Sequence, residues 1–408
     1  MTATAETAQP ARASLELARQ VILDDARTVF GYELAAGTEP ARGEQIAELV
    51  SHALALCASK PLAERRVLFL HCGPEALDSE HLALADATRI VLRLSLPANP
   101  DAAQLAAGAA RLAELRQKGF RFALPHDVLA TAWHGWLAQA DFLLLDVTRL
   151  PAPALAGVVK LARQHKPRLL ACGVPDDACL RSLRQLGIDL FQGPFFSRPV
   201  PVPGQKMRPS QAAALQLLSL VRREADVGEI EALLKRDTAL SFQLLRFINS
   251  GAFALQGEVT SLRSAVMVVG MHRMMRWSTL LLATAGDAPA LGHHAIVRGR
   301  LMELLGAELL PPDQCDQAFV TGVFSLLDAM TGVPMKTALE GLGLPIAVTD
   351  ALLDQKGVFE PFLSLAQACE SGDAEAFARD ADRLLLSGRQ INMAHLQALA
   401  WAEDLLTR

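Results

Sequence analysis

The sequence predicts a two-part chain: an α/β domain of the (β/α)8-barrel type, followed by an all-α domain that forms a helical bundle. Short apolar runs alternate with helical segments in the first half. A proline-rich stretch, SRPVPVPGQKMRPS (197–210), interrupts the chain near its middle, and helical periodicity dominates from there to the end. We therefore expect a flexible tail over 1–17, a barrel domain over 18–200 and a helical domain over 201–408.

Eight apolar runs in the first half have the length and composition of β-strands. Their alternation with helical segments implies parallel pairing through helical crossovers, and consecutive apolar residues, as in FLLLDV, are typical of strands buried on both faces. Only the first link, DDAR (24–27), is short enough for a hairpin. Seven or eight such units are enough to close a barrel, and a doubly wound open sheet is the alternative. The predicted strands span 20–23, 28–35, 66–71, 89–96, 120–125, 141–147, 168–174 and 189–194.

Helices are predicted between these strands and throughout the second half. The segment DAAQLAAGAARLAELRQKG has Asp101 as a helix N-cap, apolar residues at helical spacing and Gly119 as a stop. Asp127 is interpreted as the N-cap of the helix DVLATAWHGWLAQ. The predicted helices span 41–58, 75–86, 101–118, 127–139, 152–166, 176–187, 210–224, 227–235, 238–249, 261–269, 271–284, 289–307, 313–330, 346–354, 359–369, 373–386 and 389–406.

Composition narrows the function classes. The chain has 408 residues, of which 51% are hydrophobic and 20% charged, with a net charge of −5, so it can bury large cores and has no overall positive field for nucleic acid. No apolar stretch of about 20 residues occurs, and the first residues lack a secretory apolar region. The six cysteines form no C-x-x-C pair, so they are expected to be small buried side chains. We expect a cytoplasmic protein without membrane or nucleic-acid partners.

Two segments of the first half resemble a known family. VFGYELA contains Glu33, and GIDLFQGPFFSRP (187–199) contains Gln192 in a G-x-x-x-x-QG-x-x-F-x-x-P pattern. Together with the order of elements, these motifs resemble the EAL domain, the barrel phosphodiesterase of cyclic di-GMP signalling, over roughly residues 18–200. The resemblance implies divalent cations held by carboxylates at the C-terminal ends of the strands. It places Glu33, Asp146 and Gln192 at retained positions of that site.

Most other positions of the implied site carry a different kind of residue. In place of the arginine, asparagine, glutamate, aspartate pair, lysine and second glutamate that the resemblance implies, the chain has Gly37, His71, Arg93, Pro125 with His126, Leu144 and Pro175. A guanidinium repels a divalent cation, and one Glu with one Asp is a poor Mg²⁺ site. We therefore expect a degenerate site without metal or other cofactor, in a chain that is not an enzyme. Glu33 is then a relic whose replacement by Gln leaves function nearly intact.

The segment 231–277 has the most specific pattern of the second half. It resembles the HDOD domain, a helical relative of the HD phosphohydrolases in bacterial signalling proteins, and the resemblance covers about 200–408. Asp237 and Ser261 are also placed to cap helices, so most of the signature is expected to serve the fold. The signature positions are Asp237, Asn249, Ser250, Ser261, Arg263 and Gly270.

The second half offers little for metal chemistry. An active HD site needs adjacent His and Asp, but Ser325 and Leu326 stand at those positions. The pair His293–His294 is the other candidate, yet neighbouring residues on a helix point about 100° apart and do not easily face one ion. Arg298 and Arg300 are interpreted as part of a solvated helix face, with an anion or nucleic-acid patch as the alternative.

The two resemblances together predict a non-catalytic bacterial signal-transduction scaffold that acts through protein–protein interaction. Its expected partners are unidentified signalling proteins, with a homo-oligomer left open, and cyclic di-GMP is not expected as a partner. Two alternatives stay open: a cyclic di-GMP-binding sensor without hydrolysis, and a residual cyclic di-GMP phosphodiesterase.

Overall fold

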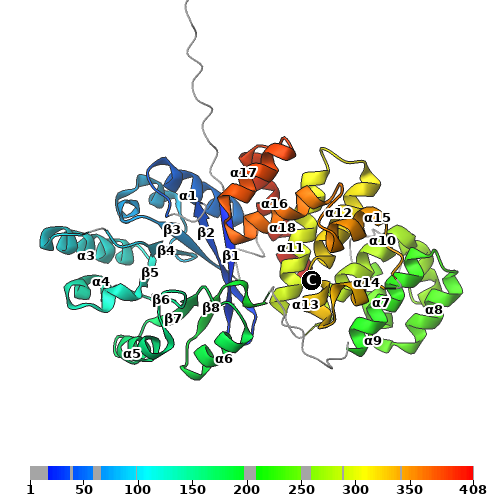
Figure 1. The fold of residues 1–408 in the computed structure, drawn as a ribbon, viewed down its shortest axis with the longest axis horizontal. Helices are drawn as coiled ribbons and strands as arrows, with labels where there is room; N and C mark the ends of the chain where they lie inside the picture. Colours follow the sequence, from blue (N-terminus) through cyan, green and yellow to red (C-terminus); the bar gives the residue numbers. More distant parts are fainter. Residues whose placement is uncertain are drawn as a thin grey trace, which may run out of the picture.

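The fold comes from a computed structural model, which describes residues 17–36, 40–57, 66–97, 99–196, 208–249, 259–286, 289–340 and 342–407. A closed eight-stranded barrel is followed by a set of packed helices, which confirms the predicted fold class (Figure 1). The predicted tail over 1–17 lies outside the described residues except for Leu17, where the first strand begins. Among the described helices, none is long and apolar enough to cross a membrane.

The barrel contains one antiparallel strand among seven parallel ones. Strand β1 pairs antiparallel with both β2 and β8, and all other neighbouring pairs are parallel. The short β1–β2 link confirms the predicted hairpin, and closure rules out the open sheet. The strands are β1 Leu17–Asp24, β2 Val29–Ala36, β3 Val67–Cys72, β4 Ile90–Leu94, β5 Arg121–Pro125, β6 Phe142–Asp146, β7 Arg168–Cys172 and β8 Leu190–Gln192.

The connections of the barrel are helical in part. Four contain regular helices: α1 Glu44–Cys57, α3 Ala102–Gln117, α5 Ala152–Ala162 and α6 Asp177–Gln185. Asp101 caps α3 through a capping box, as predicted. The predicted helix 75–86 is instead two 3₁₀ turns, η1 Pro74–Asp78 and η2 Glu80–Leu84.

The predicted helix 127–139 is also wrong. It consists of η3 His126–Leu129, η4 Thr131–Trp133 and the single turn α4 His134–Leu137, and Asp127 lies inside η3 instead of capping a helix. The indole nitrogen of Trp136 donates to the carbonyl of Leu105 at 3.0 Å, and its ring lies where a side chain at Gly108 would be. Packing against α3 therefore determines this connection more than helical propensity does.

The second half is helical throughout its described part. The predicted helix 313–330 divides at Ser325–Leu326, and α10 has a break at Gly270, whose φ of 72° suits glycine. The helices are α7 Pro209–Arg222, α8 Val227–Arg236, α9 Thr238–Ile248, α10 Leu262–Thr284, α11 Pro289–Gly306, α12 Pro312–Phe324, α13 Leu327–Thr331, α14 Met335–Leu339, α15 Ile346–Leu353, α16 Glu360–Ser371, α17 Ala374–Arg383 and α18 Gly388–Thr407.

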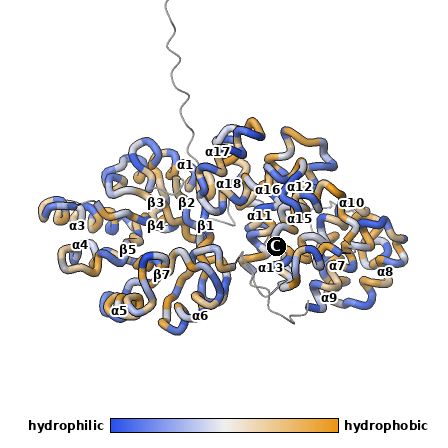
Figure 2. The backbone as a smooth tube through the Cα atoms, viewed as in Figure 1, coloured by the Kyte–Doolittle hydropathy of each residue, from blue (hydrophilic) through white to orange (hydrophobic). Residues whose placement is uncertain are grey.

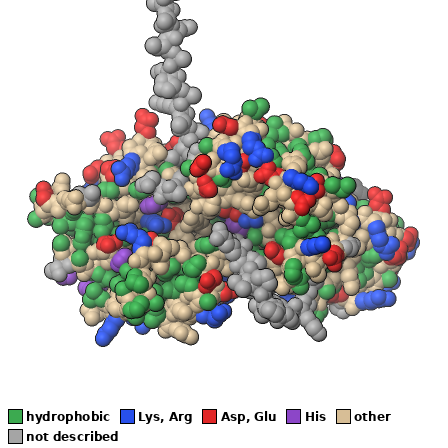
Figure 3. Space-filling view, viewed as in Figure 1, with side chains coloured by type: hydrophobic (Ala, Val, Ile, Leu, Met, Phe, Trp, Pro, Cys, Tyr) green, Lys and Arg blue, Asp and Glu red, His purple; other side chains and the backbone are tan. Residues whose placement is uncertain are grey.

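Helices of the second half cover the outer face of the first hairpin. One hydrophobic core runs from the outer side of β1 and β2 into α11, α16 and α18, and apolar residues recur along the elements of both halves (Figure 2). A separate apolar cluster, which includes Ile22, Phe69 and Phe142, fills the inside of the barrel. On the face shown in Figure 3, Lys and Arg are interspersed with Asp and Glu, so no field of one sign dominates that face.

Buried polar groups also join the hairpin to the last helix. The Tyr32 hydroxyl donates to Oε1 of Glu403 at 2.7 Å, and Nε of Arg66 donates to the same oxygen at 3.0 Å. Nε2 of His293 lies 3.2 Å from this oxygen. Burial opposes the charge on Glu403, but the hydrogen bond from His293 and the charge of Arg66 outweigh it and lower the pKa of Glu403 to about 2.

We predict that this carboxylate makes the stability of the junction depend on pH. A carboxyl with a pKa of about 2 when folded and 4.5 ordinarily stabilises the fold above pH 4.5, and this stabilisation is lost as the pH falls toward 2. Glu403→Gln should therefore lower the free energy of unfolding by roughly 3 kcal/mol at neutral pH. The difference from the wild type should shrink below pH 4.5 in chemical denaturation experiments. A difference that stays constant with pH would contradict this assignment.

Candidate functional site

The C-terminal ends of strands β3 to β7 surround a cavity of about 820 Å³, which we call the mouth cavity. Its wall combines two arginines, two histidines, an indole and two carboxylates with a set of apolar side chains. Such a mixture at this end of a parallel barrel is typical of binding and active sites. The lining residues are His71, Arg93, Leu94, Ser95, Leu96, Pro97, Asn99, Pro100, Pro125, His126, Asp127, Trp133, Leu144, Asp146, Arg149 and Cys172.

Glu33 lies beneath this cavity on the inward side of β2. Gly31, two residues earlier on the same side, packs so closely on β3 that a Cβ atom would lie 2.1 Å from the carbonyl oxygen of Val67. The close approach of the two strands helps to bury Glu33, which is only 5% exposed. The sequence GYELA therefore places a carboxylate in the barrel interior, where an unpaired charge would be costly.

Three side chains surround the Glu33 carboxylate. Arg93 on β4 forms an ion pair with Oε2, and Nε2 of Gln192 on β8 donates to the same oxygen at 2.6 Å. Nδ1 of His71 on β3 lies 3.7 Å from Oε1. Burial alone would raise the pKa of Glu33, but the charge of Arg93, together with His71 and Gln192, gives a net lowering. Glu33 is therefore bound into a network, and the description of an idle relic does not fit its surroundings.

The arginine of this network affects the neighbouring titratable groups. Burial and the positive charge of Arg93 lower the pKa of His71 to about 4, so this imidazole is neutral at physiological pH. Burial raises the pKa of the Cys172 thiol to about 12, which leaves it protonated. The lining of the mouth cavity thus contains a permanent cation, Arg93, whose partner Glu33 lies beneath it.

The residues present do not fit a divalent cation. Oδ1 of Asp146 already accepts hydrogen bonds from the backbone and hydroxyl of Thr148, at 3.0 and 2.6 Å. The Glu33 carboxylate is occupied by Arg93 and Gln192, and Gln192 offers a neutral amide. Over the described ranges, no group of three or more His, Cys, Asp or Glu could hold a metal ion.

The predicted positions of the helical half have mainly local contacts. Asp237 caps α9 through the amide of Leu240, Ser261 caps α10 through that of Ser264, and Arg263 pairs with Glu231 at 3.5 Å. Asn249 exchanges two hydrogen bonds with the backbone of Val259, at 3.0 and 2.9 Å. Ser250 and Gly37, named in the sequence analysis, lie outside the described residues.

The histidine pair and Arg298 of α11 are buried, and Arg300 is half-buried, instead of solvated. His293 contacts Glu403, whereas the imidazole of His294 lies 3.0 Å from Glu370, so the two rings serve different partners, as their helical spacing predicts. Arg298 forms two hydrogen bonds with Glu370, at 3.0 and 2.5 Å, and Arg300 pairs with Glu303 at 2.8 Å. The expectation of a solvated face was wrong because α11 is the central helix of the bundle, and its composition alone does not show this.

Comparison with known proteins identifies one matching domain family and two similar proteins. Residues 208–326 match the HDOD domain, so the second half contains a member of this domain family. The chain is 26% identical over 298 residues to "Cyclic di-GMP phosphodiesterase CdgJ" of Vibrio cholerae, covering 72% of this chain and 69% of the relative. It is also 26% identical over 231 residues to "Uncharacterized protein YuxH" of Bacillus subtilis, covering 54% of this chain and 55% of that protein.

Solved EAL proteins are similar to part of the chain. An EAL domain protein from Listeria monocytogenes is 15% identical with a TM-score of 0.36, and the match covers 45% of this chain and 88% of that one. A standalone EAL protein from Vibrio cholerae in its c-di-GMP-bound form is 16% identical with a TM-score of 0.35, covering 46% and 93%. The first half of the chain is thus similar to EAL domains.

These comparisons correct two expectations from the sequence. The expectation that the chain is not an enzyme is contradicted by its relationship to a protein that is named a cyclic di-GMP phosphodiesterase. The expectation that cyclic di-GMP is not a partner is contradicted by the same relative, whose name states that it acts on this nucleotide. Both expectations were drawn from the replacement of residues in the site that the EAL resemblance implied. These replacements do not determine which ligands the remaining cavity can bind.

We predict that the Glu33–Arg93 pair is needed for the stability of the barrel. Glu33→Gln would leave the Arg93 guanidinium without its counter-charge in a mostly buried position, and should lower the free energy of unfolding by about 3 kcal/mol. The double variant Glu33→Gln with Arg93→Met should recover much of this loss, because both charges are then absent. Denaturant unfolding of the two variants and the wild type measures this difference.

The pair Arg27–Asp177 is the matched control. Its side chains are 31% and 43% exposed, so Asp177→Asn should cost less than about 1 kcal/mol. Equal losses in the free energy of unfolding for Glu33→Gln and Asp177→Asn would show that the interior pair stabilises the fold no more than the exposed pair does.

Proposed function

We propose that this chain recognises cyclic di-GMP in the mouth cavity of its barrel, as part of bacterial signalling in the cytoplasm. The observation that carries the proposal is the mouth cavity itself, whose 820 Å³ and mixed cationic, aromatic and amide lining suit a cyclic dinucleotide. Its position at the C-terminal ends of the strands is the usual ligand position in such barrels. The name of the relative CdgJ supports the same ligand.

The chemistry of the lining matches the parts of this ligand. Arg149 is exposed and, within the described part of the chain, has no ion-pair partner, so its guanidinium is available for a phosphate. Trp133 offers a ring on which a guanine base can stack. Asn99 and Asp127 supply polar groups suited to base edges. Arg93 adds positive potential at the bottom of the cavity, although Glu33 balances part of its charge.

Hydrolysis of cyclic di-GMP is the second candidate function. The observation that favours it is the name of the relative, which matches across 72% of this chain. The mouth cavity contributes cations that would stabilise negative charge on a phosphate under attack. Binding of cyclic di-GMP and its hydrolysis are measured separately, so the experiment below includes both.

We predict that cyclic di-GMP binds to the purified full-length chain with measurable heat in titration calorimetry. Arg149→Met should weaken binding by about tenfold, the effect of losing one charge-assisted contact, and Trp133→Leu should weaken it through lost stacking. Arg181→Met, on the exposed side of α6, is the control and should bind like the wild type. Chromatography of the same mixtures, with Mn²⁺ and after chelation, detects linear products.

Two results would contradict recognition of cyclic di-GMP in the mouth cavity. If the wild type binds no cyclic di-GMP, or if Arg149→Met and Arg181→Met behave alike, the mouth cavity is not the recognition site. Linear product formed by the wild type and reduced in Arg149→Met would establish the second candidate.

A further inference from the structure

A second cavity, of about 670 Å³, lies between the barrel and the helical half, and we call it the junction cavity. One wall is the start of β1 with the chain segments that follow β7 and β8, and the opposite wall is built by α11, α16 and the start of α17. It shares no lining residue with the mouth cavity. The lining residues are Arg19, Gln20, Val21, Gly173, Gly193, Pro194, His294, Arg298, Ser325, Leu326, Ser364, Gln367, Ala368, Glu370, Ser371, Asp373 and Ala376.

Arg19 is the exceptional member of this wall. It lies on the outer side of β1, is only 1% exposed, and its guanidinium stacks over the ring of Tyr32 at 5.4 Å. None of its three side-chain nitrogens has a hydrogen-bond partner in the described part of the chain. Buried arginines are normally paired with an acceptor, because an unpaired buried charge is costly. An unpartnered guanidinium that lines a cavity therefore indicates a missing anionic partner.

The nearby charges leave this positive charge unbalanced. Arg298 and Glu370 neutralise each other through two hydrogen bonds, and Glu370 also contacts His294. Burial lowers the pKa of His294, which keeps this imidazole neutral at physiological pH. Asp373 also lines the cavity, but its side chain accepts a hydrogen bond from the amide of Ala376 as the N-cap of α17. No carboxylate within this set forms an ion pair with Arg19.

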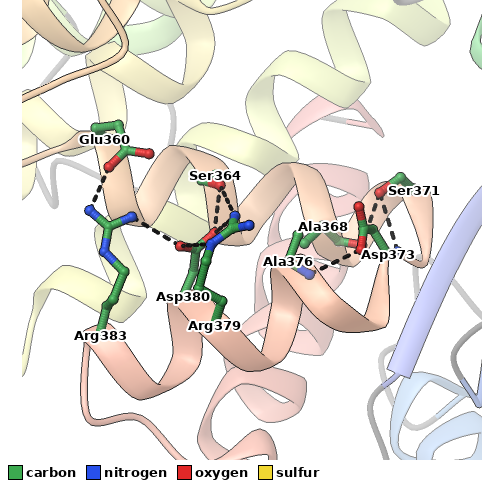
Figure 4. A network of polar contacts seen from close by, with 9 residues as sticks. All are labelled: Glu360, Ser364, Ala368, Ser371, Asp373, Ala376, Arg379, Asp380 and Arg383. Atoms are coloured by element: carbon green, nitrogen blue, oxygen red, sulfur yellow. Dashed lines mark hydrogen bonds and ion pairs between the residues drawn. The ribbon is translucent and has the colours of Figure 1, made fainter.

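The wall formed by α16 and α17 is held in place by its own polar network (Figure 4). The buried carboxylate of Asp380 accepts from Ser364 at 2.5 Å, from Arg379 at 2.9 Å and from Arg383 at 3.1 Å. Arg383 also reaches Glu360 at 2.8 Å, so the two helices are joined along their length. The cavity is therefore preformed between rigid elements, which reduces the entropy cost of binding a ligand there.

We infer that the junction cavity binds a small organic molecule through a carboxylate or phosphate group that pairs with Arg19. A guanidinium offers two parallel donors to either oxyanion, which matches the three free nitrogens. The nitrogens are covered in the present side-chain position, so this pairing requires the arginine side chain to turn toward the cavity. Gln20, Gln367 and the serines of the wall offer hydrogen bonds to the rest of the ligand, and the volume admits a body up to nucleotide size.

The test uses inorganic phosphate and acetate as probes, with chloride at equal ionic strength as the reference. The thermal midpoint of the full-length wild type should rise with phosphate, acetate or both, since a ligand that binds the folded state stabilises it. Arg19→Met, which keeps the length of the side chain and removes its charge, should abolish the rise. In calorimetric titration, the same variant should weaken binding of the stabilising anion by about tenfold or more.

Two further variants separate anion binding in the junction cavity from anion binding elsewhere on the chain. Gln367→Trp adds bulk at an exposed lining position and should also abolish the response, which keeps the test decisive if Arg19→Met fails to fold. Arg181→Met changes an exposed arginine that lines neither cavity and should respond like the wild type. A response lost in Arg181→Met but kept in the other two, an equal response in all variants, or no response in the wild type would overturn the proposal. Because the two cavities have different linings, these outcomes do not depend on cyclic di-GMP recognition.

Discussion

The structure depends on covering the outer face of its first β-hairpin. In a barrel of parallel strands, each crossover helix covers the strands it connects, but the link between β1 and β2 is a turn and supplies no helix. The outer apolar side chains of this hairpin would then face water. Helices α11, α16 and α18 take the missing place, so a single core extends through both halves of the chain. Barrel and bundle therefore share a core, where a flexible linker would have left them independent.

The shared core also explains the unusual concentration of buried charge at the junction. Tyr32 and Arg66 from the barrel meet Glu403 and His293 from the helices, and each group satisfies a partner from the other half. A buried ion pair adds little to stability when compared with apolar packing, but removing one partner is expensive. Such contacts therefore penalise any arrangement in which the two halves are displaced. Arg19 is the exception, since its charge has no such partner among the residues that the structure describes.

At the barrel mouth, residues that replace the implied metal site form polar contacts of their own. Arg93 brings a permanent charge into the interior, and it is arranged with Gln192 and His71 around the carboxylate of Glu33. Two of the substituted positions, His71 and Arg93, thus form a new network with Glu33 and Gln192, and a cavity lined partly by polar groups lies above it. Sequence comparison by position could detect the loss of acidic residues. It could not detect this compensation, because the partners come from strands that are far apart in the chain.

The sequence alone determined the order of elements, the hairpin at the start and most helix boundaries, because these follow from local periodicity, capping residues and the length of each connection. It left an open sheet as the alternative to the closed barrel. It also located Glu33, Gln192 and the HDOD signature. Tertiary structure decided which helices became short turns, why Arg298 is buried, and which residues meet at the junction. Contacts such as Tyr32 with Glu403 join residues hundreds of positions apart, and no local pattern encodes such a meeting. The lack of a hydrogen-bond partner for Arg19 in the described part of the chain can be recognised only in the folded structure. It depends on which residues of the two halves surround the guanidinium.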